Sequence, residues 1–299
     1  MASTKDIQRR IKSISNTKKI TKAMEMVAAA KMRRAVEAVL KTRAYANLSW
    51  RTVLDLSQGQ SNDLHPLLTK RDKIDKVGII LITSNRGLCS GFNTAIINKA
   101  HQSVKKFNQD TDFIIIGKKG RAIYKYYNYH VEAEFTKEDI ISEVKEVIPL
   151  SKMVIDDYLI GKYNKIMLAY TDYINAAVQI PRIKQLLPID ITIEDEYLGA
   201  VGKDEVEEIK RGSIDYTFEP SAREVLDEMI PRLIEVQLFQ ALLESNASEH
   251  SARMTAMHQA NEAAGDLVSE LTLSYNKARQ ASITAEIAEI SAGANALAD

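Results

Sequence analysis

Long stretches without helix-breaking residues at both ends constrain the fold of this chain more than any other feature. The first glycine is Gly59 and the first proline is Pro66, so residues 1–58 contain neither. Residues 221–299 contain one proline, Pro231, and two glycines. Glycine and proline disfavour a helix interior more than any other residues. Each end of the chain is therefore predicted to form one very long helix.

The spacing of apolar residues in these two segments agrees with that prediction. Ile7, Ile11 and Ile14 show steps of four and three residues, and Ile283, Ile287 and Ile290 show the same steps near the other end. Such steps give a helix one narrow apolar stripe. The phase slips between successive sets in the first segment, as in a weakly supercoiled helix. Proline lacks an N–H, so Pro231 is expected to kink or restart the second helix.

The two terminal segments carry opposite charge. Residues 1–58 hold 13 Lys and Arg against 4 Asp and Glu, whereas residues 221–299 hold 5 against 12. This contrast favours an antiparallel coiled coil of the two helices, with the longer second helix able to overhang. The alternative is that the basic segment binds nucleic acid. We favour the pairing within the chain because the matching acidic segment is present.

The middle of the chain alternates between strand and helix patterns, which predicts βαβ units and a mainly parallel sheet. The expected strands are 76–85, 112–118, 131–135 and a hairpin of 165–173 with 177–189, and the expected helices are 94–107, 119–127 and 137–163. The fold class is thus α/β with long helical arms and a Rossmann-like central domain. The predicted parts are an N-terminal helix (1–58), the central domain (70–190), an acidic connecting loop (191–219) and a C-terminal helix (220–299).

Composition excludes several classes of protein. Apolar residues make up 45% and charged residues 27%, as in an ordinary globular protein. No run approaches the ~18 apolar residues of a membrane span, and we expect no secretory signal and no direct lipid insertion. The single cysteine, Cys89, cannot form an internal disulfide and fits a reducing compartment.

The central domain carries little that suggests catalysis. "TSNRGLCSGFN" (83–93) lies between a predicted strand and helix, where α/β folds bind phosphates, but its spacing matches neither common phosphate-binding motif. A tight turn is the favoured interpretation, and "GKKGR" (117–121) is interpreted as a solvated basic loop. The five histidines show no metal-ligand spacing and no motif relation to Cys89. We therefore expect no catalytic residues, cofactor or metal.

Two short zones are apolar on nearly every side of their predicted helices. Between Lys22 and Lys31 only Glu25 is charged, and residues 291–298, "SAGANALA", are small and uncharged. One partner helix cannot cover every face, so a second and larger partner is predicted. Small side chains at the tip would let a helix turn or slide within a narrow socket.

At these residues the sequence resembles a known family. "ITKAMEMVAAAKM" near the start and "KARQASITAEIAEISAGANAL" near the end are similar to the gamma subunit of the F-type ATP synthase. "TSNRGLCSGFN" resembles the central-domain turn of that family, and the order of long helix, α/β domain and long helix matches from end to end.

The resemblance implies a non-catalytic rotary shaft. In that family the paired helices turn inside a ring of alpha and beta subunits, and the α/β domain lies with epsilon on the membrane ring of c subunits. Partners implied are the alpha, beta, epsilon and delta subunits and the c-ring, with no nucleic acid. Proton or sodium flow would drive ATP synthesis at the beta subunits. A peripheral protein on the cytoplasmic face of a bacterial cell membrane is expected.

The resemblance also implies roles for particular residues. Those expected to contact the alpha/beta ring are Lys22 and Met24 near the start and Arg279, Gln280, Thr284 and Glu286 near the end.

In the central domain, Gly87, Cys89 and Asn93 match the family's turn. Asn85 and Ser90 depart from the commoner Asp and Gly there. The photosynthetic versions carry a regulatory cysteine pair, and with Cys89 alone that form of regulation is not expected.

Two other classes of function make different predictions. A nucleotide-binding α/β enzyme with dimerising helical arms would bind ATP or NAD tightly, even as fragment 70–190. A nucleic-acid scaffold using residues 5–43 would bind DNA with a steep dependence on salt.

Overall fold

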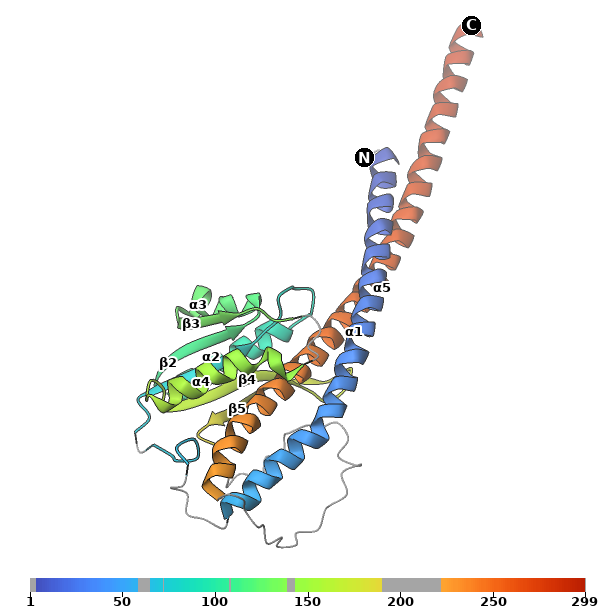
Figure 1. Ribbon diagram of the computed structural model, residues 1–299. Coiled ribbons are helices and arrows are strands. Elements are labelled where there is room, and N and C mark those ends of the chain that lie inside the picture. The colour runs from blue at the N-terminus through green and yellow to red at the C-terminus, as the bar shows by residue number, and fades with distance from the viewer. Residues whose placement is uncertain are drawn as a thin grey trace. The chain divides into compact units, whose positions relative to one another are not determined.

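A computed structural model describes residues 4–58, 65–71, 73–107, 109–138, 143–189 and 222–298 (Figure 1). The two long helices predicted from the sequence are present. Helix α1 spans Thr4–Gln58 and helix α5 spans Ala222–Ala298. With 77 residues at ~1.5 Å per residue, α5 is about 115 Å long. The predicted connecting loop 191–219 lies outside the described residues.

Pro231 lies inside α5 without interrupting it, so the expectation that the helix restarts there is wrong. Proline removes one backbone hydrogen bond. The apolar side chains on either side, Ile230, Leu233 and Ile234, are fully or almost fully buried in the main core. Packing of these side chains therefore holds the helical turn that proline weakens.

The segment between the two long helices in sequence forms a five-stranded sheet with the order β3-β2-β1-β4-β5. Strands β1, β2, β3 and β4 run parallel, and β5 pairs antiparallel with β4 as the predicted hairpin. The strand bounds are Lys76–Ile82 for β1, Asp110–Ile116 for β2, His130–Phe135 for β3, Lys165–Tyr173 for β4 and Gln179–Leu187 for β5. This order confirms the predicted Rossmann-like, mainly parallel sheet.

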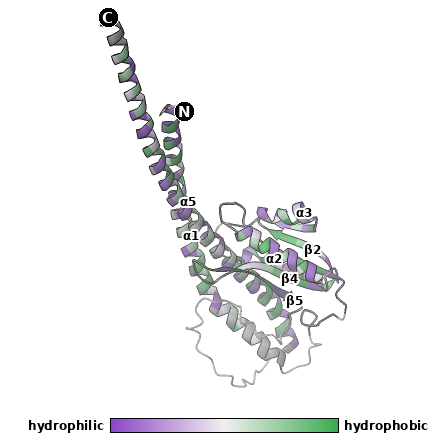
Figure 2. Ribbon diagram, turned by 180° about the vertical axis from the view of Figure 1, so that it is seen from behind, coloured by the Kyte–Doolittle hydropathy of each residue, from purple (hydrophilic) through white to green (hydrophobic). Residues whose placement is uncertain are grey.

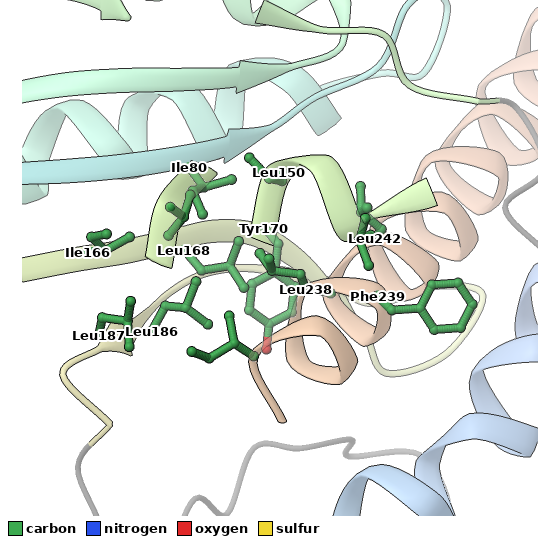
Figure 3. Packing of buried hydrophobic residues seen from close by; sticks show 14 of the residues in the cluster. Ile80, Leu150, Ile166, Leu168, Tyr170, Leu186, Leu187, Leu238, Phe239 and Leu242 are labelled. Atoms are coloured by element: carbon green, nitrogen blue, oxygen red, sulfur yellow. The ribbon is translucent and has the colours of Figure 1, made fainter. Parts of the chain in front are cut away.

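The residues of β1 show how the sheet is buried on both faces. Val77, Ile79 and Leu81 pack into one cluster with helices α2 (Phe92–Phe107) and α3 (Ala122–Tyr127). Ile80 and Ile82 belong to the cluster on the other face, with residues of helix α4 (Ile148–Leu159) and helix α5. Figure 3 shows Ile80 in this cluster with Leu150 of α4 and Leu238 of α5. Alternate residues of a strand face opposite sides, so one apolar strand contributes to two cores.

The single helix expected over 137–163 is wrong. A short 3-10 turn spans Val144–Glu146, and α4 begins only at Ile148. Pro149 lies in the first turn of α4, where its fixed φ is compatible with helix and its missing N–H costs nothing. Gly161, with a φ of 85°, follows the end of the helix. Proline and glycine thus delimit α4 within a longer periodic stretch.

The chain forms two compact units. One consists of residues 28–253 and contains the sheet, α2, α3, α4 and the adjoining parts of the long helices. The other, which we call the terminal unit, consists of residues 1–27 and 254–299. Each unit contains a part of α1 and a part of α5.

Candidate functional site

The two helices of the terminal unit run antiparallel, as predicted. Glu25 of α1 lies level with His258 of α5, with 3.3 Å between the carboxylate and Nδ1. Seven residues earlier in α1, Lys18 lies against Gly265, seven residues later in α5; a Cβ on that glycine would be 2.9 Å from the Lys18 ammonium. The residue number therefore falls along α1 as it rises along α5.

A small charged network surrounds Glu25 at the level of Lys22. Lys22 donates to both oxygens of Glu25 at 3.1 Å, and His258 lies between Glu25 and Glu262, 3.5 Å from the latter. The hydrogen bond from Lys22 is the main cause that lowers the pKa of Glu25. Lys22, one of the predicted contact residues, is thus exposed to solvent and also forms an ion pair with Glu25 of its own helix.

The same level of α1 also presents apolar side chains to solvent. Ile20, Met26 and Val27 are 60%, 59% and 56% exposed, while Met24 is half-buried and Ala28 is buried. Next to them is a shallow groove of about 500 Å³ lined by Lys18, Lys19, Lys22, Ala23, Met26 and Asn261. The zone that is apolar on nearly every face is therefore covered on one side by α5 and open on the other.

A second level lies further along α5, where all four predicted contact residues, Arg279, Gln280, Thr284 and Glu286, are exposed. The Thr284 hydroxyl donates to the backbone oxygen of Gln280 at 2.9 Å, and Ser282 lies 3.5 Å from Glu286. Around them Ile283, Ile287 and Ile290 are 46%, 61% and 72% exposed. Hydrophobic and hydrophilic residues thus alternate along this exposed stretch of α5, as the colours of Figure 2 show.

The two levels are separate along the helical axis. With Glu25 level with His258, Met24 lies level with residue 259, and Thr284 is 25 residues further along α5. At ~1.5 Å per residue this separation is about 38 Å. The structure therefore does not bring Met24 and Thr284 together. The side chains of residues 293–298 lie outside the description.

The predicted central-domain turn connects β1 to α2, and its side chains bond inward. The Asn93 amide accepts from the backbone N–H of Ser84 at 2.9 Å and donates to Cys89 Sγ at 3.3 Å. Cys89 is buried with Phe92. Leu88 and Ser90 have positive φ values of 62° and 50°, which a tight connection requires. The geometry agrees with the interpretation of 83–93 as a tight turn.

The turn is also attached to α5. Arg253 donates to the backbone oxygens of Arg86 and Gly87 at 3.2 Å. Gly87 and Asn93 therefore belong to a joint between the sheet and the long helix, whereas the residues predicted to contact the ring lie in the terminal unit.

Three groups near the β3 edge of the sheet could in principle hold a cation. They are Asp112 of β2 and His130 and Glu132 of β3, whose ligand atoms lie within 4.8 Å of one another. However, Asp112 already accepts from Lys76 at 2.8 Å, and Glu132 pairs with Lys162 at 2.8 Å. Two ammonium groups thus supply the positive charge that a metal would bring.

Buried charges on α5 were missed from the sequence. Glu244 lies 4.0 Å from Arg43 of α1 and accepts from Gln240 at 2.9 Å. Burial, reinforced by the negative charge of Asp172, raises the pKa of Glu244 to about 8. The signal available in the sequence was the run 244–253, "ESNASEHSAR", in which small residues separate Glu244, Glu249 and Arg253.

The fold and the exposed helical surfaces define a subunit that acts through contacts within a larger assembly. The family model described as ATP synthase matches residues 3–297. The chain belongs to the family of ATP synthase gamma chains, and as such it is a non-catalytic stalk subunit of an F-type ATP synthase.

Relatives agree over the full length. The ATP synthase gamma chain of Herpetosiphon aurantiacus is 42% identical, with 99% of each chain covered. That of Pelotomaculum thermopropionicum is 41% identical, with 99% of this chain and 100% of the relative covered.

Solved structures show the same fold. A chain of the Euglena gracilis mitochondrial ATP synthase, in a structure of OSCP, F1 and c-ring, matches with a TM-score of 0.70 at 21% identity, covering 98% of this chain and 94% of that one. A chain of the Tetrahymena thermophila central stalk and c-ring matches with a TM-score of 0.60 at 20% identity, covering 81% and 99%.

Proposed function

We propose that this chain turns as the central shaft inside a ring of alpha and beta subunits. Through that rotation, transmembrane proton or sodium flow is coupled to ATP synthesis and hydrolysis at the beta subunits. A shaft changes a catalytic site only through contacts that differ between the conformations of that site. The two levels of exposed residues on the terminal unit would supply such contacts.

The exposure of α5 from residue 281 to residue 290 carries this proposal. Every residue in this stretch is exposed, including Ile283, Ile287 and Ile290. An isolated helix in water gains little from its own hydrogen bonds, and exposed apolar groups favour burial. A surrounding partner would cover all of its faces at once, as a bearing formed by a ring does.

The charges at the first level suit the same partner. The groove beside Met26 is lined by Lys18, Lys19 and Lys22, so an acidic loop of a ring subunit would fit against it. Lys22 and Met24 would contact the ring here, and Arg279, Gln280, Thr284 and Glu286 would contact it at the second level.

The remaining partners follow from the family. The Euglena gracilis structure is one of OSCP, F1 and c-ring, and the Tetrahymena thermophila structure is one of central stalk and c-ring. We infer F1 and a c-ring as partners of this chain, together with epsilon and delta. None of the described helices is long and apolar enough to cross a membrane. We place the chain as a peripheral protein on the cytoplasmic face of a bacterial cell membrane.

Alanine substitutions at the second level test the contact residues. In a complex reconstituted with alpha and beta subunits, Arg279→Ala should lower ATP turnover about tenfold, because a hydrogen bond from a charged group contributes ~1.5 kcal/mol or more. Gln280→Ala should lower it about fivefold, since its bonds are neutral. Steady-state ATPase assays measure both effects.

Lys277→Ala is the matched control, because Lys277 is an exposed cation on the same helix outside the proposed contact set. It should leave turnover near that of the wild type. Unchanged turnover and coupling in both Arg279→Ala and Gln280→Ala would contradict these contacts. Failure of the wild-type chain to co-purify with alpha and beta subunits would contradict the proposed function itself.

A further inference from the structure

One stretch of α5 is buried on every face. All residues from Val236 to Ala252 are at most 9% exposed, including the polar residues Gln237, Gln240, Glu244, Asn246, Glu249 and His250. At ~1.5 Å per residue the stretch is about 25 Å long. A helix on the surface of a domain normally buries only one face. The unit of residues 28–253, which we call the α/β unit, therefore encloses α5 here, and its last residue on the helix is Arg253.

A chain of charged groups crosses from the sheet to this enclosed helix. Lys137, which follows β3, donates to Oε2 of Glu249 at 2.7 Å, and both residues are buried. Arg253 lies 2.9 Å from Oε1 of the same carboxylate. Burial alone would raise the pKa of Glu249, but the two cations lower it. Glu249 is therefore held as a carboxylate between two cations.

Arg253 continues the chain into the turn between β1 and α2. Its guanidinium donates to the backbone oxygens of Arg86 and Gly87 at 3.2 Å. Asn85 of the same turn donates to the backbone oxygen of Lys137. The turn, the segment after β3 and the helix are thus connected in a closed circuit of hydrogen bonds.

Serine hydroxyls attach the helix to a third element. Ser248 donates to the backbone oxygen of Thr171 in β4 at 3.2 Å, and Ser251 donates to that of Ala176 in the β4–β5 turn at 2.8 Å. The helix is consequently bonded to the sheet in more than one direction around its axis.

Directional bonds resist rotation in a way that apolar packing does not. Hydrophobic contacts are non-directional. In contrast, a hydrogen bond weakens steeply when its geometry is lost. A 20° turn of the helix would move an atom ~6 Å from its axis by about 2 Å, which is enough to break each of these bonds.

We propose that Glu249, with Lys137 and Arg253, locks α5 against rotation about its own axis within the α/β unit, and that torque passes between sheet and shaft through this joint. The three are positioning residues, because they would act through α5 and not on a reacting group. The inference rests on the proposed function, since a joint carries torque only in a chain that turns.

Single-molecule rotation of the assembled complex tests the joint. The ring is fixed to glass, and a bead is attached through Lys125→Cys on α3, an exposed position of the α/β unit. The angular variance of the bead during nucleotide-arrested pauses measures torsional stiffness. Glu249→Gln and Lys137→Gln should each raise this variance 1.5-fold or more.

Two further variants separate the joint from general stability. Arg253→Lys keeps a positive charge near Glu249 but loses the guanidinium contacts to the turn, so the variance should rise while the melting temperature of the isolated chain stays near that of the wild type. Lys162→Gln removes a less buried ion pair, with Glu132, on another part of the sheet, and the variance should stay unchanged.

The outcomes are distinguishable. If the wild-type complex rotates and Arg253→Lys, Glu249→Gln and Lys137→Gln all keep wild-type variance, the joint is overturned and the proposed function stands. If the wild-type bead does not rotate with ATP, the proposed function fails. Should the two glutamine variants not assemble, Arg253→Lys alone decides.

Discussion

At the scale of single residues, the most unusual group is the Glu244 carboxyl. It is buried where α1, α5 and β4 meet, 4.0 Å from Arg43 and close enough to Asp172 to feel its charge. Arg182 already pairs with Asp172 at 2.6 Å. Two carboxyl groups in one buried site do not both ionise readily. The Glu244 carboxyl therefore keeps its proton at pH values well above those at which a glutamate usually ionises.

This protonation predicts a pH dependence of stability. The pKa of Glu244 is raised from 4.5 to about 8 in the folded chain. Between these values the folded state binds a proton that the unfolded state releases, so the free energy of unfolding falls as pH rises, by about 5 kcal/mol in all. Urea unfolding of the wild type and of Glu244→Gln between pH 5 and 9 measures this slope.

The glutamine variant keeps the hydrogen-bond acceptor for Gln240 but cannot ionise, so its stability should change less with pH over this range. Glu262→Gln, at an exposed carboxylate on the same helix, is the matched control and should keep the wild-type slope. Equal slopes in the wild type and Glu244→Gln would contradict a buried, protonated Glu244.

At the scale of elements, most of the fold could be predicted from the sequence, because its strongest signals are patterns that extend over whole segments. The long helices follow from the absence of Gly and Pro before Gly59, and the strands from short β-branched runs such as 76–82. The helix expected over 137–163 failed because apolar spacing alone does not mark where a helix begins. Pro149 and Gly161 carried that information, and Lys137 turns inward to bind Glu249 instead.

The candidate site was predicted less completely than the fold. Family resemblance pointed to Lys22, Arg279 and their neighbours, and the structure leaves Lys22 and Arg279 exposed; their contacts with a ring stay predictions. The joint around Glu249 was missed, because which charges are buried depends on packing between segments more than 100 residues apart. The spacing of residues within one segment does not indicate such pairs.

Two glycines illustrate how element geometry decides the effect of one methyl group. Gly265 lies inside α5, and an added Cβ would meet only the Lys18 ammonium, at the end of a flexible side chain. Gly265→Ala should therefore stabilise the paired helices by about 0.5–1 kcal/mol, since alanine favours helix over glycine. Thermal and urea unfolding followed by circular dichroism measure the change.

Gly117→Ala serves as the opposite case. Gly117 has a φ of 93°, and an added Cβ would lie 2.4 Å from the backbone oxygen of Thr83. We expect a loss of about 2 kcal/mol or more, because both the backbone conformation and the space exclude a side chain. Destabilisation by Gly265→Ala, or tolerance of Gly117→Ala, would refute this account.

At the scale of the whole molecule, the two units differ in how far they bury α5. Residues 236–252 of α5 are buried on every side, whereas residues 281–290 of the same helix are exposed on every side. Segments with few buried contacts open locally at a lower free energy than segments in the core. One continuous helix therefore contains a stretch that its own chain packs on every side and a stretch that its own chain leaves exposed on every side.

Hydrogen exchange of backbone amides would reveal this gradient. In the isolated chain, amides of residues 236–252 should exchange only with global unfolding, while those of 279–290 should exchange orders of magnitude faster, because their helix lacks tertiary packing. On assembly with alpha and beta subunits, exchange at 279–290 should slow at least tenfold, and α2 (Phe92–Phe107) should serve as the unchanged internal control. Mass spectrometry of peptides from both states measures the change.

Equal protection of the two stretches in the isolated chain would refute the gradient. Unchanged exchange at 279–290 after assembly would show that the ring does not enclose this end of the helix.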